Sequence, residues 1–310
     1  MSDQITTAFV EQFRNNVTML AQQQGSRLRG SMREVDITGK AVFMEQMGPT
    51  QAQRVTTRHA DSPLINTEFR RRRLTPIDID WGDLVDDFDR LKLLIEPTDP
   101  MAQNAAWAIG REIDDIGFEK FFSVAYTGEE GNTQVSFPAS QKVDGTLNEG
   151  ELSGDTTSDA TMSGLNIDKL QAAREILEAN EVDLDVETPH IALPAKALMR
   201  DMLSLKRATN ADFATVRALV NGEIDTFMGF RFIRSERVPK DNSGNFRLPV
   251  WVPSGMGLAV AKEPTARIEP RPDKRFSTYV YYASSVGASR LEEEKVVEIP
   301  VHKTNKPDTN

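Results

Sequence analysis

The side chains best suited to chemistry in this sequence are aspartates in adjacent pairs. Asp86-Asp87 and Asp114-Asp115 are such pairs, and carboxylate oxygens are the ligands that hard divalent cations prefer. Adjacent residues of a helix point in different directions, so we interpret both pairs as solvated helix faces rather than as a metal site. A soluble acidic enzyme that holds a metal with these four aspartates is kept as an alternative hypothesis.

Other arrangements that would indicate catalysis do not occur in the sequence. The histidines His59, His190 and His302 are far apart and have no partners at metal-ligand spacing. The sequence has no His-Glu-x-x-His pattern, no Gly-x-Ser-x-Gly elbow and no Gly-Lys-Ser/Thr phosphate loop. It has no cysteine, which excludes thiol nucleophiles, disulfides and Cys-zinc sites. We therefore predict a protein that is not an enzyme and has no cofactor or metal.

Opposite charges follow each other in the first third of the chain. Residues 54–73 carry six basic residues against two acidic ones, and include the run Arg70-Arg71-Arg72-Arg73. Residues 78–96 carry seven acidic residues against two basic ones. A basic segment beside an acidic one is what a self-complementary oligomer needs, although the charges could equally pair within one subunit or form a solvated patch.

The overall composition limits the partners of the chain. It has 310 residues, a net charge of −10 and a pI of about 5.0. A general nucleic-acid binder needs an excess of Lys and Arg, so we expect contacts with DNA to be weak and nonspecific. No apolar run approaches the length of a membrane span, and the polar N-terminus is not a secretory signal.

The element that must position these side chains is one long helix, expected over residues 99–126. Asp99 is a good N-cap and Pro100 suits the first helical position. An apolar stripe follows at spacings of three and four, and Gly128 stands where a helix usually ends. The members of the stripe are Ala102, Ala105, Ala106, Ile109, Ile113 and Ile116.

Shorter patterns predict mixed helices and strands around it. An amphipathic helix is expected over residues 5–20, a turn at 38–40 with a strand over 41–47 running back, and a short helix within 78–96. Asn166 is expected to cap a second helix. Strands are expected at 134–137, 190–193, 227–233, 249–252, 258–261, 266–269, 277–282 and 296–301, and helices at 194–205 and 211–220.

A succession of short motifs resembles the major capsid proteins of tailed bacteriophages. The motifs are weak singly, but their order and spacing together are fairly specific. They are Thr56-Thr57-Arg58-His59, Ser62-Pro63-Leu64, the four arginines, Asp80-Trp81, Asp86-Asp87-Phe88-Asp89, Gly110-Arg111 with Asp114-Asp115, and the segment GFRFIRSERVP at 229–239.

The resemblance implies an α+β fold shared by tailed phages of the Hong Kong type, herpesviruses and encapsulins. It implies an N-terminal arm at 1–30, an extended β-hairpin loop at 31–75, and a peripheral domain at 76–185 whose spine is the helix at 99–126. An axial α/β domain at 186–265 follows, and residues 266–310 return to the peripheral domain and end in a tail.

The implied function is that of a major capsid protein that self-assembles, as pentamers and hexamers, into an icosahedral head around double-stranded DNA. The implied location is the virion, after assembly in the cytoplasm of the host bacterium, without contact with a membrane. Some relatives carry a cleavable N-terminal scaffolding segment that this sequence does not show, so a separate scaffolding protein is expected. A portal protein and a decoration protein are the other implied partners, and an encapsulin-like nanocompartment shell is the alternative.

The residues expected at contacts between subunits come from the two charged segments. Arginine forms bidentate pairs with carboxylates, so the basic segment of one subunit is expected to meet acidic residues of the next. Relatives in which Lys and Asn are covalently linked bring Lys40 and Lys142 into consideration, but no motif assigns either. The expected contact residues are Arg58, Arg70, Arg71, Arg72, Arg73, Asp78, Asp80, Asp86 and Asp87.

Overall fold

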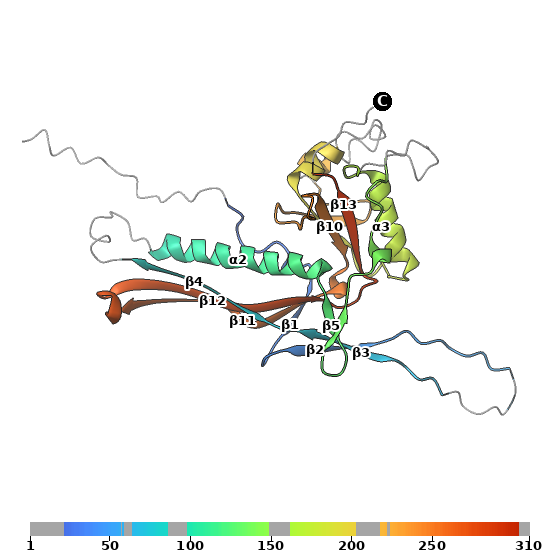
Figure 1. Cartoon of the computed structure of the whole chain (residues 1–310), viewed down its shortest axis with the longest axis horizontal. Coiled ribbons are helices and arrows are strands. Elements are labelled where there is room, and N and C mark those ends of the chain that lie inside the picture. The colour runs from blue at the N-terminus through green and yellow to red at the C-terminus, as the bar shows by residue number, and fades with distance from the viewer. Residues whose placement is uncertain are drawn as a thin grey trace, which may run out of the picture. The chain divides into compact units, whose positions relative to one another are not determined.

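The computed structural model describes residues 22–56, 58, 64–85, 98–148, 162–202, 218–221 and 224–303. These residues form three β-sheets, two α-helices and several short helical turns, as Figure 1 shows. The α+β class expected from the sequence is confirmed. The helix expected over 5–20 and most of the one expected over 211–220 lie outside the described residues.

The long helix is α2 (Thr98–Phe122), so its prediction is confirmed over most of its length. The last four expected residues are wrong, because β5 (Ala125–Thr127) begins there. Val124, Tyr126 and Thr127 are β-branched or aromatic residues, which fit a pleated sheet better than a helix end. Gly128 has a φ of 95° in the turn after β5, and so does not cap α2.

A four-stranded sheet contains the hairpin expected near the arginine run. Its order is β2-β3-β5-β6, with β2 (Val42–Met47), β3 (Phe69–Leu74) and β6 (Thr133–Val135). β2 and β3 pair antiparallel from Val42 opposite Leu74 to Met47 opposite Phe69. We call residues 42–74 the finger. β1 (Arg33–Asp36) does not pair with β2 as expected, but lies parallel to β11 in another sheet.

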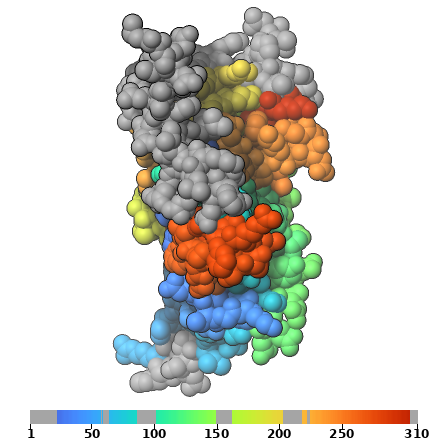
Figure 2. Space-filling view, turned by 90° about the vertical axis from the view of Figure 1, so that its left-hand side faces the viewer, coloured from blue at the N-terminus to red at the C-terminus, as the bar shows by residue number. Residues whose placement is uncertain are grey.

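That other sheet has the order β1-β11-β12-β4 and contains the longest strands of the described chain. They are β4 (Ile77–Val85), β11 (Met256–Arg271) and β12 (Ser277–Arg290). The short helix expected within residues 78–96 was based on the apolar residues from Leu84 to Leu94. Leu84 and Val85 belong to β4 instead, and the rest of that helix lies outside the described residues. Figure 2 shows the end of the β11–β12 hairpin as an orange-red patch.

A five-stranded sheet contains many of the buried apolar residues. Its order is β13-β10-β7-β9-β8, with β13 (Val296–Val301), β10 (Phe246–Trp251), β7 (His190–Leu193), β9 (Phe230–Arg234) and β8 (Thr226–Phe227). The expected strands at 190–193 and 296–301 are confirmed. The one expected at 227–233 is interrupted by a turn, where Met228 has a φ of 52°.

Helix α3 (Ile167–Ala179) packs against β13, and its predicted cap is confirmed. The side chain of Asn166 accepts a hydrogen bond from the backbone N–H of Lys169. The helix expected over 194–205 is confirmed as far as the structure describes it. Residues 195–202 are helical, with a π-helical stretch over Ala197–Asp201, and residues 203–205 lie outside the described residues.

The chain divides into two compact units. The first comprises Met1–Ser26, Asp78–Glu112 and Lys262–Ser284, and the second comprises Arg27–Ile77, Ile113–Ala261 and Ser285–Asn310. In the first, Gly82 leaves room for the ring of Tyr279, whose hydroxyl would lie 2.1 Å from a Cβ added there. In the second, the buried indole of Trp251 donates to the carbonyl of Ser31 at 2.8 Å.

Candidate subunit interface

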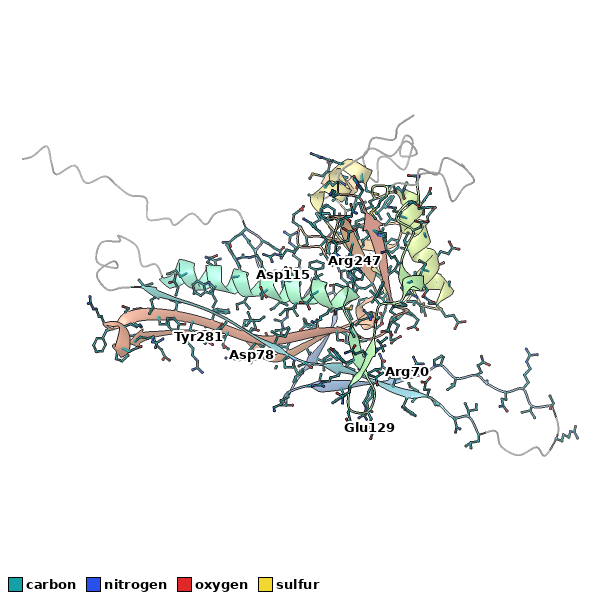
Figure 3. The ribbon with its side chains drawn as sticks, in the orientation of Figure 1. Arg70, Asp78, Asp115, Glu129, Arg247 and Tyr281 are labelled. Atoms are coloured by element: carbon teal, nitrogen blue, oxygen red, sulfur yellow. The ribbon has the colours of Figure 1, made fainter. Side chains whose placement is uncertain are left out.

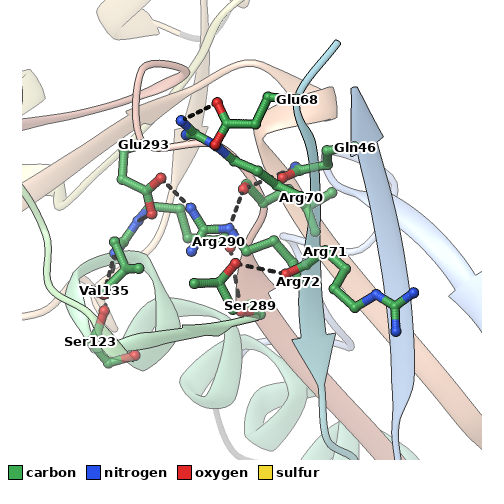
Figure 4. Close-up of polar contacts among 12 residues, drawn as sticks. Gln46, Glu68, Arg70, Arg71, Arg72, Ser123, Val135, Ser289, Arg290 and Glu293 are labelled. Carbon is green, nitrogen blue, oxygen red and sulfur yellow. Dashed lines mark hydrogen bonds and ion pairs between the residues drawn. The ribbon is translucent and has the colours of Figure 1, made fainter. Parts of the chain in front are cut away.

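The base of the finger is attached to its own unit by a buried cluster of charges. Arg72 is 4% exposed, and its guanidinium donates to the carbonyl oxygen of Leu291 at 2.8 Å and to the carboxylate of Glu293. Gln46, on the neighbouring strand, donates to the same carbonyl oxygen at 3.0 Å. Both finger strands are therefore bound to the segment that follows β12 (Figure 4).

Arg290 completes this cluster from the end of β12. Its side chain is fully buried and donates to the carbonyl oxygens of Phe121 at 2.8 Å, Ser123 at 3.1 Å and Val135 at 3.3 Å. It also pairs with Glu293 at 3.3 Å. Burial lowers the pKa of Arg290, and Glu293 opposes that shift. Because its donors satisfy carbonyls at the end of α2 and on β6, Arg290 joins three elements at one point.

The outer arginines of the same run have exposed partners. Arg70 pairs with Glu68 at 3.0 Å, with more than half of each side chain exposed. Arg71 pairs with Glu45 at 3.2 Å and donates to the carbonyl oxygen of Glu129, also at 3.2 Å. The Arg70 guanidinium lowers the pKa of Glu68. Exposed pairs of this kind exchange partners readily, because each is worth about 1 kcal/mol or less.

An open groove of about 710 Å³ runs beside these arginines. Arg70 and Glu129 both line it and are labelled in Figure 3. Four glutamates and three arginines line it, so it presents both signs of charge. They are Glu45, Glu68, Glu129, Glu293, Arg70, Arg71 and Arg72.

The finger also exposes large apolar side chains. Met47 is 65% and Phe69 is 69% exposed, and the two are directly opposite in the β2–β3 register. Val55 and Leu64, farther out on the finger, are 87% and 88% exposed. Beyond Arg72, where β3 pairs with β5, no other described strand pairs with the finger, and an isolated two-stranded hairpin is at best marginally stable in water. A hairpin that exposes both apolar and charged side chains is suited to bind the surface of another subunit.

The structure places the other expected contact residues in different settings. Arg58 is exposed and Arg73 is half-buried. Asp78 and Asp80 are exposed on β4, an outer strand of its sheet. Asp86 and Asp87 lie outside the described residues.

The sequence left open whether the arginines pair within one subunit or between subunits. Arg72 pairs within its own chain, because its partners are Leu291 and Glu293. For Arg58, Arg70, Arg71 and the two aspartates of β4, a contact with another subunit stays a prediction.

The pair Asp114-Asp115 has a role that the sequence reasoning missed. Asp114 is fully buried, and its carboxylate accepts the backbone N–H groups of Arg27 and Leu28 at 3.0 to 3.1 Å. Asp115 pairs with Arg237. The interpretation of Asp114 as part of a solvated face is therefore wrong, because a folded-back segment covers it.

A signal for this attachment exists in the sequence. Gly110, Asp114 and Gly117 recur at spacings of four and three, which places them on one face of α2. A Cβ added to Gly110 would lie 2.6 Å from the backbone of Gly25, so glycine is needed there for the close approach. Arg111 supports the same segment by donating to the side-chain oxygen of Gln22 at 2.8 Å.

The chemistry expected of an enzyme finds no support among the residues that the structure describes. In those residues no three His, Cys, Asp or Glu side chains are grouped so that they could hold a metal ion. Within the same part of the chain, no helix is long and apolar enough to cross a membrane.

Comparison with known proteins identifies a family for this chain. A family model described as phage capsid protein matches residues 5–302. No curated protein sequence matches the chain significantly.

Solved structures from three phages are similar over nearly the whole chain. One from Mycobacterium phage Che8 has a TM-score of 0.66 at 14% identity, covering 94% of this chain and 97% of its own. The capsid of Ralstonia phage GP4 has a TM-score of 0.71 at 11% identity, covering 98% and 97%. The capsid of cyanophage Pam1 has a TM-score of 0.65 at 11% identity, covering 97% and 98%.

Proposed function

Because this chain belongs to the phage capsid protein family and forms the shell of a phage head, we propose that its pentamers and hexamers enclose the double-stranded DNA of a tailed bacteriophage. The observation that carries the proposal is the family match over residues 5–302. The finger, with its exposed apolar and charged side chains, supports it, because a shell needs such connections between neighbouring subunits.

Several partners follow from this role. A scaffolding protein would direct assembly in the host cytoplasm, a portal protein would occupy one vertex, and a decoration protein would bind the outer face. The domain plan expected from the sequence, with arm, extended loop, peripheral domain and axial domain, belongs to the same proposal. The net charge of −10 supports the weak contact with DNA that packing and ejection require.

The experiment that tests the function is negative-stain electron microscopy of the purified chain, expressed with and without a candidate scaffolding protein. We expect uniform polyhedral shells, or rings of five and six subunits. A particle of a few subunits under both conditions would contradict the proposal. Nucleic acid inside native particles is expected, whereas protein cargo would identify a nanocompartment shell.

The finger contact has its own test. We infer that Arg70 and Arg71 meet carboxylates of a neighbouring subunit, with Asp78 and Asp80 as candidates, because both pairs of side chains are exposed. The double variant R70E/R71E is expected to yield fewer shells, counted in micrographs. Arg72 is left unchanged because its replacement would disturb the fold.

The matched control is R174E, which changes an exposed arginine on α3 whose partner is Glu178. It is expected to leave the number of shells unchanged. Partial rescue of R70E/R71E by D78R/D80R would identify the partner surface. Equal numbers of shells from R70E/R71E and the unaltered chain would contradict the contact.

A further inference from the structure

An open pocket of about 560 Å³ lies between the segment that precedes β1 and strands β7 and β9, away from the finger. Its charged lining is unlike that of the chain as a whole, with four arginines against one aspartate. These residues are Arg27, Arg29, Arg231, Arg234 and Asp225. In a chain of net charge −10, this concentration of positive charge marks a place where an anion would be attracted.

The guanidinium groups are held in place from several elements. Arg27 donates to the backbone carbonyl of Arg234 at 2.8 Å, and Arg234 donates to that of Leu219 at 2.8 Å. Arg29 pairs with Glu34 at 3.1 Å. A guanidinium has five N–H donors, so the bonds of Arg27 and Arg234 leave donors for a ligand. These hydrogen bonds orient the guanidinium groups and still leave N–H donors for a ligand.

Arg231 differs from the other three arginines. It is exposed on β9, and although its backbone N–H donates to the carbonyl oxygen of Pro189 at 2.8 Å, its side chain forms no hydrogen bond or ion pair with any residue that the structure describes. It lies directly opposite His190 in the register of β7 and β9. A fixed strand position and an unused guanidinium make Arg231 the residue most available to a ligand.

His190 forms part of the pocket wall beside Arg231. The residue is 7% exposed and lines the pocket, and its ring stacks on Trp251 with centroids 5.8 Å apart. Its Nδ1 atom is buried and has no hydrogen-bond partner in the described part of the chain. Burial and the nearby Arg231 lower the pKa of His190, which favours the neutral ring.

We propose that this pocket binds a phosphate group, and that in the assembled head this is a phosphate of the DNA backbone. The arginine fork matches phosphate oxygens in geometry and charge. Phe232 is buried and Ile233 is the other apolar side chain of the lining, so the pocket has few anchors of the kind that protein interfaces use. Contacts to phosphate carry no sequence information, so binding is independent of base sequence. The DNA assignment rests on the function proposed above.

The test uses fluorescence anisotropy with two duplex DNA probes of unrelated sequence, titrated with the unassembled full-length chain at several salt concentrations. In R231Q, affinity is expected to fall equally for both probes. The slope of log affinity against log salt is expected to fall by about one, as for the loss of one phosphate contact. R174Q, which removes an exposed arginine outside the pocket, is expected to keep the slope of the unaltered chain.

Inorganic phosphate separates the possible sources of the group. It is expected to displace DNA from the unaltered chain and to have less effect on the DNA that R231Q still binds. Binding of inorganic phosphate without binding of DNA would overturn the DNA assignment. Competition by a poly-glutamate peptide stronger than that by DNA would overturn the proposal in favour of a protein partner, and an unchanged salt slope in R231Q would overturn it outright.

Shell assembly gives a readout that is independent of the pocket. R231Q is expected to form shells in normal number, because the variant keeps the backbone hydrogen bond to Pro189 and the side chain of Arg231 has no bond within the described chain to lose. Normal shells with an unchanged salt slope would refute the phosphate site alone. Absence of shells from the unaltered chain would instead refute the proposed function.

Discussion

At the base of the finger Arg72 is 4% exposed and pairs with Glu293, whereas Arg70, two residues away on the same strand, pairs with Glu68 in solvent. The two residues share a type and a strand, but not an environment. Removing one partner of a buried pair strands a charge in a medium of low dielectric, whereas water replaces a lost exposed partner. The buried cluster is therefore expected to hold the fold, and the exposed pairs are expected to be free for exchange with a neighbour.

The largest expected effect comes from R290M. The variant leaves the carbonyls of Phe121 and Ser123 without their donor and weakens the support of Glu293. We expect the free energy of unfolding to fall by about 3–5 kcal/mol, measured by urea denaturation of the unassembled chain. R70M is the exposed control, and a loss as large as that of R290M would break the comparison.

Lys169 extends the comparison to a buried amine whose hydrogen bonds go to backbone carbonyls, while the charges of Asp201 and Asp144 favour its protonated form. Its amine donates to the carbonyl oxygens of Gly145 at 3.0 Å, Ser163 at 3.1 Å and Pro300 at 2.8 Å. Burial lowers its pKa to about 7, below the ordinary value of 10.5. Between these two values the unfolded chain binds the proton and the folded chain does not, so the stability contributed by Lys169 rises with pH.

The variant K169M tests this sign. The difference in unfolding free energy between the unaltered chain and K169M is expected to grow by about 1.4 kcal/mol per pH unit above pH 7, up to the pKa of the unfolded lysine. Below pH 7 the difference is expected to be constant. Urea denaturation at pH 6, 7, 8 and 9 measures it, and a difference that does not change between pH 7 and 9 would contradict the lowered pKa.

Asp114 and Asp115 provide an adjacent buried and exposed pair on one helix. D114A leaves the backbone N–H groups of Arg27 and Leu28 without their acceptor, which is expected to cost about 1–3 kcal/mol. D115A removes a pair whose partners are 40% and 34% exposed, and is expected to cost about 1 kcal/mol or less. Thermal unfolding and limited proteolysis near residues 22–30 distinguish them, and equal losses would remove the distinction between the two aspartates.

The smallest effect is expected at Arg71 and Glu45. A double-mutant cycle with R71M and E45Q should give a coupling energy of about 0.2–1 kcal/mol, which decreases as salt is raised. Chemical denaturation at low and high salt measures it. A coupling above about 2 kcal/mol would mean that the outer finger is as tightly bound to its own chain as buried pairs are.

Local patterns were sufficient for the elements whose stabilising groups lie close in sequence. The stripe from Ala102 to Ile116 predicted α2, and Asn166 predicted the start of α3 through a bond to a residue three positions away. The order of the short motifs also indicated the family that the whole-chain match shows. In these cases the prediction depends only on residues within a few helical turns or on the order of motifs along the chain.

Tertiary structure alone decided which charges are buried. Arg72 and Arg70 cannot be distinguished in the sequence. Arg72 is buried because Leu291 and Glu293, more than two hundred residues later, fold onto it. The pairing of β4 with β12 was likewise absent from the sequence prediction, because the two strands are about two hundred residues apart. Burial and strand pairing depend on segments that meet only in three dimensions, and the energy of a charge depends on that burial more than on its neighbours in sequence.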